Sequence, residues 1–123
     1  MFFLRRRIRR KAPAGPEVER LRAQAKKELP PRLAELASLH GFEYNRLAIK
    51  NNVSNWGSCS SKKNINLNLR VVTLPPQLRD YVMLHELCHL RYLNHGPQFH
   101  ALLETVCPGH RILARQLREY RLV

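Results

Sequence analysis

The chain has 123 residues, enough for one domain with a modest core that needs no disulfides. It contains no run of eighteen apolar residues, which argues against a membrane span, and Met1–Leu4 is too short for the apolar core of a signal peptide. The three cysteines form no Cys-x-x-Cys pair, so we expect no disulfide framework and a cytoplasmic location.

The formal net charge is +13, which favours polyanionic partners such as nucleic acid, nucleotides or acidic proteins. Six of the twenty-two cations lie in residues 5–11, and a segment rich in proline, alanine and glycine follows. We therefore predict a basic tail and linker over residues 1–16 and one folded domain over residues 17–123. The basic run contains no aromatic residue for base stacking, so it suits a solvated tail as well as a nucleic-acid-binding arm.

Residues 17–39 carry apolar side chains at close to helical spacing and predict the first helix. Pro30 and Pro31 interrupt this pattern. We expect them to kink the helix or to divide it into two. His40 and Gly41 mark its expected end.

Short strands are expected next, at residues 46–50 and from residue 56, where Trp56 should anchor the core or a hairpin. Residues 51–55 between them are rich in turn-forming asparagine. Residues 64–69 alternate strictly between apolar side chains and asparagines, which is typical of a half-buried strand.

Three further helices are predicted, at residues 75–92, 97–106 and 109–119. The first is apolar on nearly every side and should be buried, and two prolines suit its start. The order of elements predicts an α+β fold, in which a small antiparallel sheet packs against this buried helix and against the N-terminal and C-terminal helices.

The segment 85–89 reads His-Glu-Leu-Cys-His and carries the strongest chemical signal in the chain. On a helix, His85 and His89 leave the same face one turn apart, close enough to bind one ion. Glu86 lies about 100° around the helix, where it can reach a water beside that ion. This is the zincin arrangement, with two zinc ligands and a carboxylate general base. Cys88 points away from the ligand face, and we interpret it as a small core residue.

Catalytic zinc usually has three protein ligands. A turn at residues 94–97 can bring His95 to the metal, and the spacing favours it, with His100 as the alternative. The three histidines also fit the longer metzincin spacing. However, Tyr92 stands where that pattern has glycine, and no Met-turn sequence follows, so we reject this assignment.

An ordered series of motifs over roughly residues 20–110 resembles the YgjP-like metallopeptidase domain, which is related to the SprT and WLM zincins and to the minigluzincins. The motifs are Trp56-Gly57-Ser58-Cys59-Ser60, Ile65-Asn66-Leu67-Asn68, Tyr81 to Leu90, and Asn94-His95-Gly96-Pro97-Gln98-Phe99. The resemblance implies a minimal zincin-like fold, bound Zn2+, and His95 as the third ligand.

Several other residues receive candidate roles. By the same resemblance, the strand at 64–69 is the candidate edge strand that pairs with an extended substrate, its asparagines facing solvent or substrate. Candidates for the group that stabilises negative charge opposite the zinc are Tyr92, His100 and Arg70. Glu104 is a candidate carboxylate partner for a ligand histidine.

The leading functional hypothesis is a zinc-dependent endopeptidase, with protein or peptide substrates and Glu86 as general base. YgjP-like proteins are also linked to hydrolysis of UTP to the monophosphate and pyrophosphate, although the sequence has no Gly-rich phosphate loop. A third hypothesis is a latent or DNA-associated zincin whose basic surface binds nucleic acid.

Overall fold

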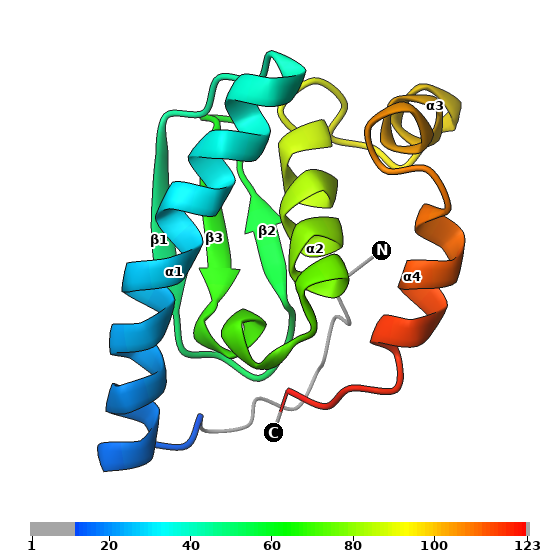
Figure 1. The fold of residues 1–123 in the computed structure, drawn as a ribbon. Helices are drawn as coiled ribbons and strands as arrows, with labels where there is room; N and C mark the ends of the chain where they lie inside the picture. Colours follow the sequence, from blue (N-terminus) through cyan, green and yellow to red (C-terminus); the bar gives the residue numbers. More distant parts are fainter. Residues whose placement is uncertain (1–11, 123) are drawn as a thin grey trace.

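The structure, a computed structural model, describes residues 12–122. The basic run at 5–11, and with it most of the predicted tail, lies outside the described residues. In chain order the elements are α1 (Pro16–His40), β1 (Arg46–Lys50), β2 (Gly57–Cys59), β3 (Asn64–Asn68), the 3-10 helix η1 (Leu69–Thr73), α2 (Pro76–Cys88), α3 (Pro97–Val106) and α4 (His110–Leu117) (Figure 1). The predicted α+β class is confirmed.

The three strands form a mixed sheet in the order β1-β3-β2. β2 pairs antiparallel with β3, as a hairpin should, but β1 pairs parallel with β3, so the expectation of an antiparallel sheet is wrong. The loop at 51–56 crosses the carboxyl end of β3 and carries the chain from one side of that strand to the other. β3 is therefore the central strand, and the expectation that it offers a free edge to substrate is also wrong.

Asn68, at the end of β3, holds this crossing loop in place. Its side-chain amide donates to the backbone oxygens of Asn52 and Asn55, at 2.7 and 3.1 Å, and its Oδ1 accepts from the backbone N–H of Arg70 at 2.9 Å. The other two asparagines of the strand, Asn64 and Asn66, bond to neighbouring side chains across the outer face of the sheet. These asparagines thus stabilise the sheet and its loop, and Asn68 is almost fully buried.

Helix α1 continues through Pro30 and Pro31 as one helix, so the alternative of two helices is wrong. Two adjacent prolines remove the helical hydrogen bonds to the carbonyls of Lys26 and Lys27, and both lysines are exposed, where water can replace those bonds. The side of the helix that carries Leu33 is buried in the core, and this packing maintains the helix across the prolines.

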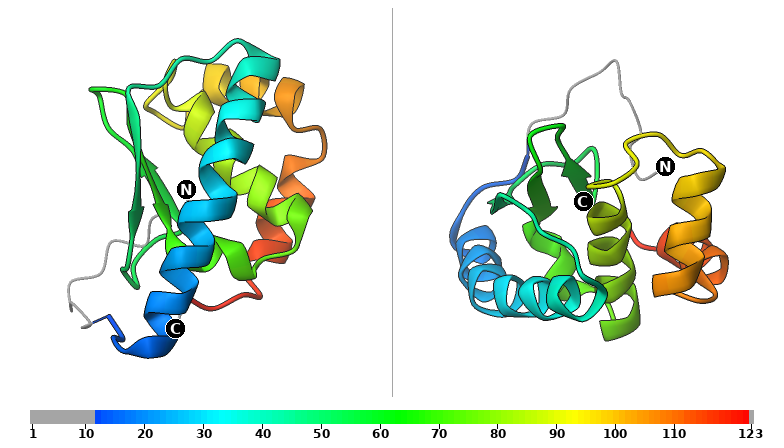
Figure 2. Two further views of the ribbon diagram at one scale, coloured as in Figure 1. Left: turned by 60° about the vertical axis from the view of Figure 1, so that its left-hand side comes forward. Right: turned by 90° about the horizontal axis from the view of Figure 1, so that it is seen from above.

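All four α-helices lie on one side of the sheet (Figure 2). α1 and α2 pack on its inner face, and α3 and α4 cover the opposite side of α2. A bidentate pair between Arg32 and Asp80, at 2.7 and 2.9 Å, and an ion pair between Arg79 and Glu28, at 2.9 Å, join α1 to α2. Residues 81–88 of α2 are thus all buried, as the apolar sequence predicts.

Replacing Asn68 with alanine should destabilise the domain strongly. The substitution leaves two loop carbonyls and one buried N–H without their partner, which costs about 2–3 kcal/mol. Asn64→Ala is the matched control, because it removes one hydrogen bond at the surface and should cost less than about 1 kcal/mol. Urea denaturation of the two variants measures the difference, and equal losses would contradict the role given to Asn68.

Candidate active site

Helix α2 carries the first part of the site in its last turn. His85, Glu86 and His89 are each at most 3% exposed, and they lie among the buried apolar residues of this part of the helix. α2 ends at Cys88, four residues earlier than predicted, and the N–H of the cap residue His89 bonds to the carbonyl of Glu86 at 3.1 Å. Cys88 itself is fully buried among core residues, as expected.

Because the helix ends there, the chain can fold back and bring His95 to the two helix histidines. The ring centroids of His85, His89 and His95 lie 4.6–5.3 Å apart, and one donor atom from each lies within 4.8 Å of the other two. His100, the alternative third ligand, is exposed and outside this group, and its ring centroid is 6.5 Å from that of His95. The geometry favours the predicted triad of His85, His89 and His95 as the group that could hold a metal.

Phe99, from the first turn of α3, packs against all three histidines. Its ring stacks on His89 at 4.4 Å between centroids and meets His85 and His95 edge-on at 5.0 and 4.8 Å. It is 1% exposed and fixes the orientation of the rings, a role that the sequence analysis missed. The sequence signal for this role was the position of Phe99, which comes four residues after His95 and just after the turn at Gly96-Pro97.

Hydrogen bonding selects one tautomer of His89. Its Nδ1 lies 2.9 Å from the backbone oxygen of Tyr92, which can only accept, so Nδ1 carries the proton and Nε2 keeps its lone pair. Nε2 of His89 and Nε2 of His95 are buried and have no hydrogen-bond partner among the described residues. Such atoms suit metal ligation, because burial without a partner is otherwise costly.

Burial also keeps the triad neutral. Removal from water lowers the pKa of His85, His89 and His95, the last to about 4, and the neighbouring imidazoles lower the pKa of His85 and His95 further. At neutral pH the three rings are therefore unprotonated, as metal binding requires.

Glu86 is fully buried, and neither carboxylate oxygen has a hydrogen-bond partner among residues 12–122. Its Oε2 lies 3.4 Å from Nδ1 of His85, but the neutral ring makes this contact no ion pair. Burial raises the pKa of Glu86 well above its usual value, which makes the carboxylate a stronger base.

Strand β2 forms the wall beside Glu86, and Gly57 makes this close approach possible. A Cβ at position 57 would lie 3.0 Å from Cγ of Glu86 and 3.2 Å from the backbone oxygen of Asn66. Only glycine leaves the carboxylate its present place. Gly57 belongs to one of the sequence motifs, but the sequence alone predicts no role for it.

The sequence model of the YgjP-like metallopeptidase domain matches residues 17–120. The chain belongs to this family. It is therefore a peptidase-like hydrolase of the metal-dependent kind, as the sequence motifs predict. No helix within residues 12–122 is both long and apolar enough to cross a lipid bilayer.

Two solved structures share the fold of this YgjP-like domain. The metallopeptidase zymogen of Pyrococcus abyssi abylysin is 23% identical with a TM-score of 0.62, over 71% of this chain and 90% of that one. The metallopeptidase zymogen of Methanocaldococcus jannaschii jannalysin is 24% identical, with the same TM-score and the same coverage. The comparison with curated proteins gives no match.

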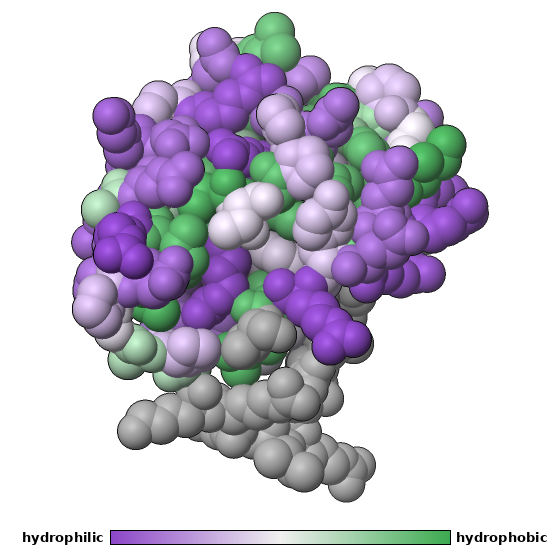
Figure 3. Space-filling model, turned by 60° about the horizontal axis from the view of Figure 1, so that its bottom comes forward, coloured by the Kyte–Doolittle hydropathy of each residue, from purple (hydrophilic) through white to green (hydrophobic). Residues whose placement is uncertain are grey.

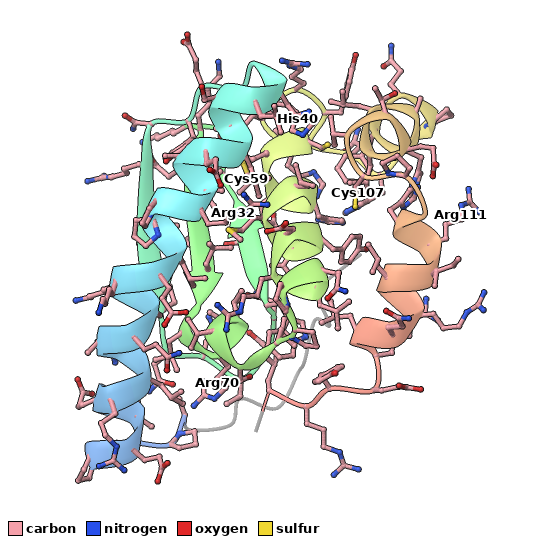
Figure 4. All side chains as sticks on the ribbon, viewed as in Figure 1. Arg32, His40, Cys59, Arg70, Cys107 and Arg111 are labelled. Carbon is pink, nitrogen blue, oxygen red and sulfur yellow. The ribbon has the colours of Figure 1, made fainter. Side chains whose placement is uncertain are left out.

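Two of the other predicted site residues lie elsewhere in the YgjP-like domain. Arg70 donates to the backbone oxygen of Asn52 at 3.2 Å, at the η1 end of the molecule, away from the last turn of α2 (Figure 4). Glu104 lies 3.4 Å from Nε2 of His110 and accepts from the N–H of Gly109, so it joins α3 to α4. Neither residue is placed to act on the histidine triad.

Tyr92 and His100 stay close to the triad. Tyr92 contributes its carbonyl to His89, and His100 lies near enough to His85 and His95 to lower the pKa of both. Of the three candidates for stabilising negative charge, Arg70 is therefore excluded by its position, and these two remain.

Replacing Gly57 with alanine should lower turnover by about 10–100-fold and leave the metal content unchanged. The added methyl group displaces Glu86, and a misplacement of about 1 Å costs a rate factor of that size. Gly96→Ala is the matched control, because a Cβ there meets no heavy atom within 4 Å and φ is negative. Peptide hydrolysis and elemental analysis test both variants. Equal turnover by the Gly57→Ala and Gly96→Ala proteins would contradict the role of Gly57.

Proposed function

We propose that the chain is a zinc-dependent endopeptidase in which His85, His89 and His95 hold the ion and Glu86 is the general base. The observation that carries this proposal is the group of three neutral imidazoles, two of them buried and one partly buried, beside a buried carboxylate that lacks a partner among the described residues. Three imidazole nitrogens favour zinc over magnesium or calcium, which prefer oxygen ligands. The site residues and the identity of the ion are our proposal, while metal dependence follows from the family.

In this proposal each residue has one task. When bound, zinc supplies a Lewis acid that polarises the scissile carbonyl and lowers the pKa of water. Glu86 accepts the proton of the attacking water on its carboxylate and passes it to the leaving amine. The hydrogen bond from Nδ1 of His89 to Tyr92 keeps Nε2 of that ring available as a ligand. Phe99 fixes the orientation of the three rings and shields their inner side from water.

The substrate is proposed to be a polypeptide bound in extended form against β2. This strand pairs with β3 on one side only among the described strands, and it borders Glu86 through Gly57. A backbone added along its free edge would lie beside the general base. β2 therefore takes the substrate role that the sequence analysis gave to the strand at 64–69.

The nucleotide alternative, hydrolysis of UTP, has less support. A triphosphate needs cationic side chains at the reacting phosphorus. The two arginines of α2 and its following turn are engaged elsewhere, since Arg79 binds Glu28 and Arg91 binds the backbone oxygen of Gly41. The three cysteines are free, which fits the reducing cytoplasm that we propose as the location.

Glu86→Gln should keep zinc near the wild-type content and reduce peptide hydrolysis by about 10²–10⁴-fold, because the amide cannot accept the proton. Metal analysis together with hydrolysis of casein tests this. Loss of zinc in step with activity would make Glu86 a ligand or a structural residue. Unchanged activity would overturn the proposed mechanism. UTP, assayed in parallel, separates the two substrate classes.

His95→Ala should abolish stable zinc binding, because it removes one of only three ligands. His100→Ala is the control at a neighbouring histidine and should keep one equivalent of zinc, since His100 lies outside the triad. Zinc titration against a chromogenic chelator measures both. The reverse result would mean that His100, and not His95, is the third ligand.

A further inference from the structure

Three arginines near the carboxyl end of the chain have no hydrogen-bond or ion-pair partner among residues 12–122, in contrast to most of the other described arginines. Every described arginine before α3, apart from Arg46, binds a carboxylate, a carbonyl or a ring: these are Arg20, Arg22, Arg32, Arg70, Arg79 and Arg91. Arg111, Arg115 and Arg118 form no hydrogen bond or ion pair with any residue in 12–122, and all three are exposed. Guanidinium groups left unpaired on a rigid element are available to an acidic ligand.

These three side chains form one row, which we call the α4 arginine row. At 100° per residue, Arg111, Arg115 and Arg118 fall within about 60° of arc on α4 and its cap residue, and they span about 10 Å along the axis. Figure 4 shows Arg111 projecting from α4 away from the rest of the molecule. In Figure 3 hydrophilic side chains cover part of the right-hand flank, as they also cover parts of the top and the left.

Each end of the row is connected to the active site through side chains that lie between them. At one end, His110 precedes Arg111, and its ring lies 6.0 Å from that of His100, which in turn is 6.5 Å from His95. At the other end, burial raises the pKa of Tyr81 and the charge of Arg118 acts against this rise, while the ring of Tyr81 is 6.0 Å from that of His85. One or two side chains therefore separate each end of the row from the triad, a separation that a few residues of extended peptide can span.

We propose that the α4 arginine row binds an acidic segment of the polypeptide substrate, beside the bond that is cleaved. This inference rests on the proposed peptidase function and names its substrate class. Arginine is suited to the task, because its planar group binds a carboxylate through two parallel hydrogen bonds. Ile112 is 58% exposed, about 60° around the helix from Arg115, where it can contact an apolar side chain of the same peptide. A nucleic acid backbone would make no use of that contact.

The first test compares two peptides of about ten residues that share one cleavable core and carry glutamates or glutamines in the flanking positions. The triple variant Arg111→Gln/Arg115→Gln/Arg118→Gln should raise KM for the acidic peptide about 10-fold, leave kcat unchanged, and leave the glutamine peptide unaffected. High salt should remove the preference of the wild-type protein for the acidic peptide. An unchanged ratio of kcat/KM for the two peptides would overturn the proposal.

The matched control is Arg46→Gln/Lys50→Gln/Lys62→Gln. It removes the same charge from exposed residues on the sheet side of the molecule, far from α4 in the fold. This variant should behave like the wild-type protein with both peptides. Equal loss in the two triple variants would mean that net charge acts without a defined surface, and the proposal would fall.

A binding assay separates this proposal from the peptidase function. In the Glu86→Gln background, fluorescence anisotropy with the labelled acidic peptide should show about 10-fold weaker binding when the row is replaced. If that difference appears while wild-type protein cleaves no peptide, the row stands and the peptidase proposal fails. If a single-stranded oligonucleotide binds through the row and the acidic peptide does not, the surface recognises nucleic acid and the proposal is overturned.

Discussion

The central constraint on this structure is the burial of polar side chains in the core of a very small domain. His85, Glu86 and His89 are buried and His95 is partly buried, and the two oxygens of Glu86 have no hydrogen-bond partner among the described residues, which costs several kcal/mol. A domain of this size has little stability to lose. One cation placed among the three imidazoles would satisfy two or more of these groups at once, which is the strongest physical reason to assign the site to a metal.

Much of the fold serves to bring these groups together. α2 ends within the motif, so that the chain can return with His95, and α3 follows directly to place Phe99 beneath the rings. On the other side, the loop held by Asn68 carries β2 across the sheet and brings Gly57 against Glu86. The ion pairs between α1 and α2 fix the helix on which the site is built. Each of these features fixes the position of a histidine ring or of the Glu86 carboxylate, and catalysis by a general base depends on such positioning.

The sequence predicts the helices and the grouping of the three histidines well, because both depend on local spacing. Histidines one turn apart, a turn five to eight residues later, and a helix that is apolar on nearly every side are visible without knowledge of distant contacts. The parallel pairing of β1 with β3 was not predictable in this way, since it depends on hydrogen bonds from Asn68 to a loop thirteen to sixteen residues earlier. The same holds for Gly57, whose importance arises from a contact with a helix far along the chain. Helix α1 continues through two prolines because of tertiary packing, which local propensity does not include.

X-ray absorption spectroscopy at the zinc edge, on protein loaded with one equivalent of zinc, tests the central claim most directly. We expect three nitrogen ligands at about 2.0–2.1 Å with the multiple-scattering pattern of imidazole, and one lighter ligand from water. The His95→Ala protein should show one imidazole fewer or no bound zinc. A sulfur shell at about 2.3 Å, or coordination without imidazole, would contradict the assignment of His85, His89 and His95 as the metal site.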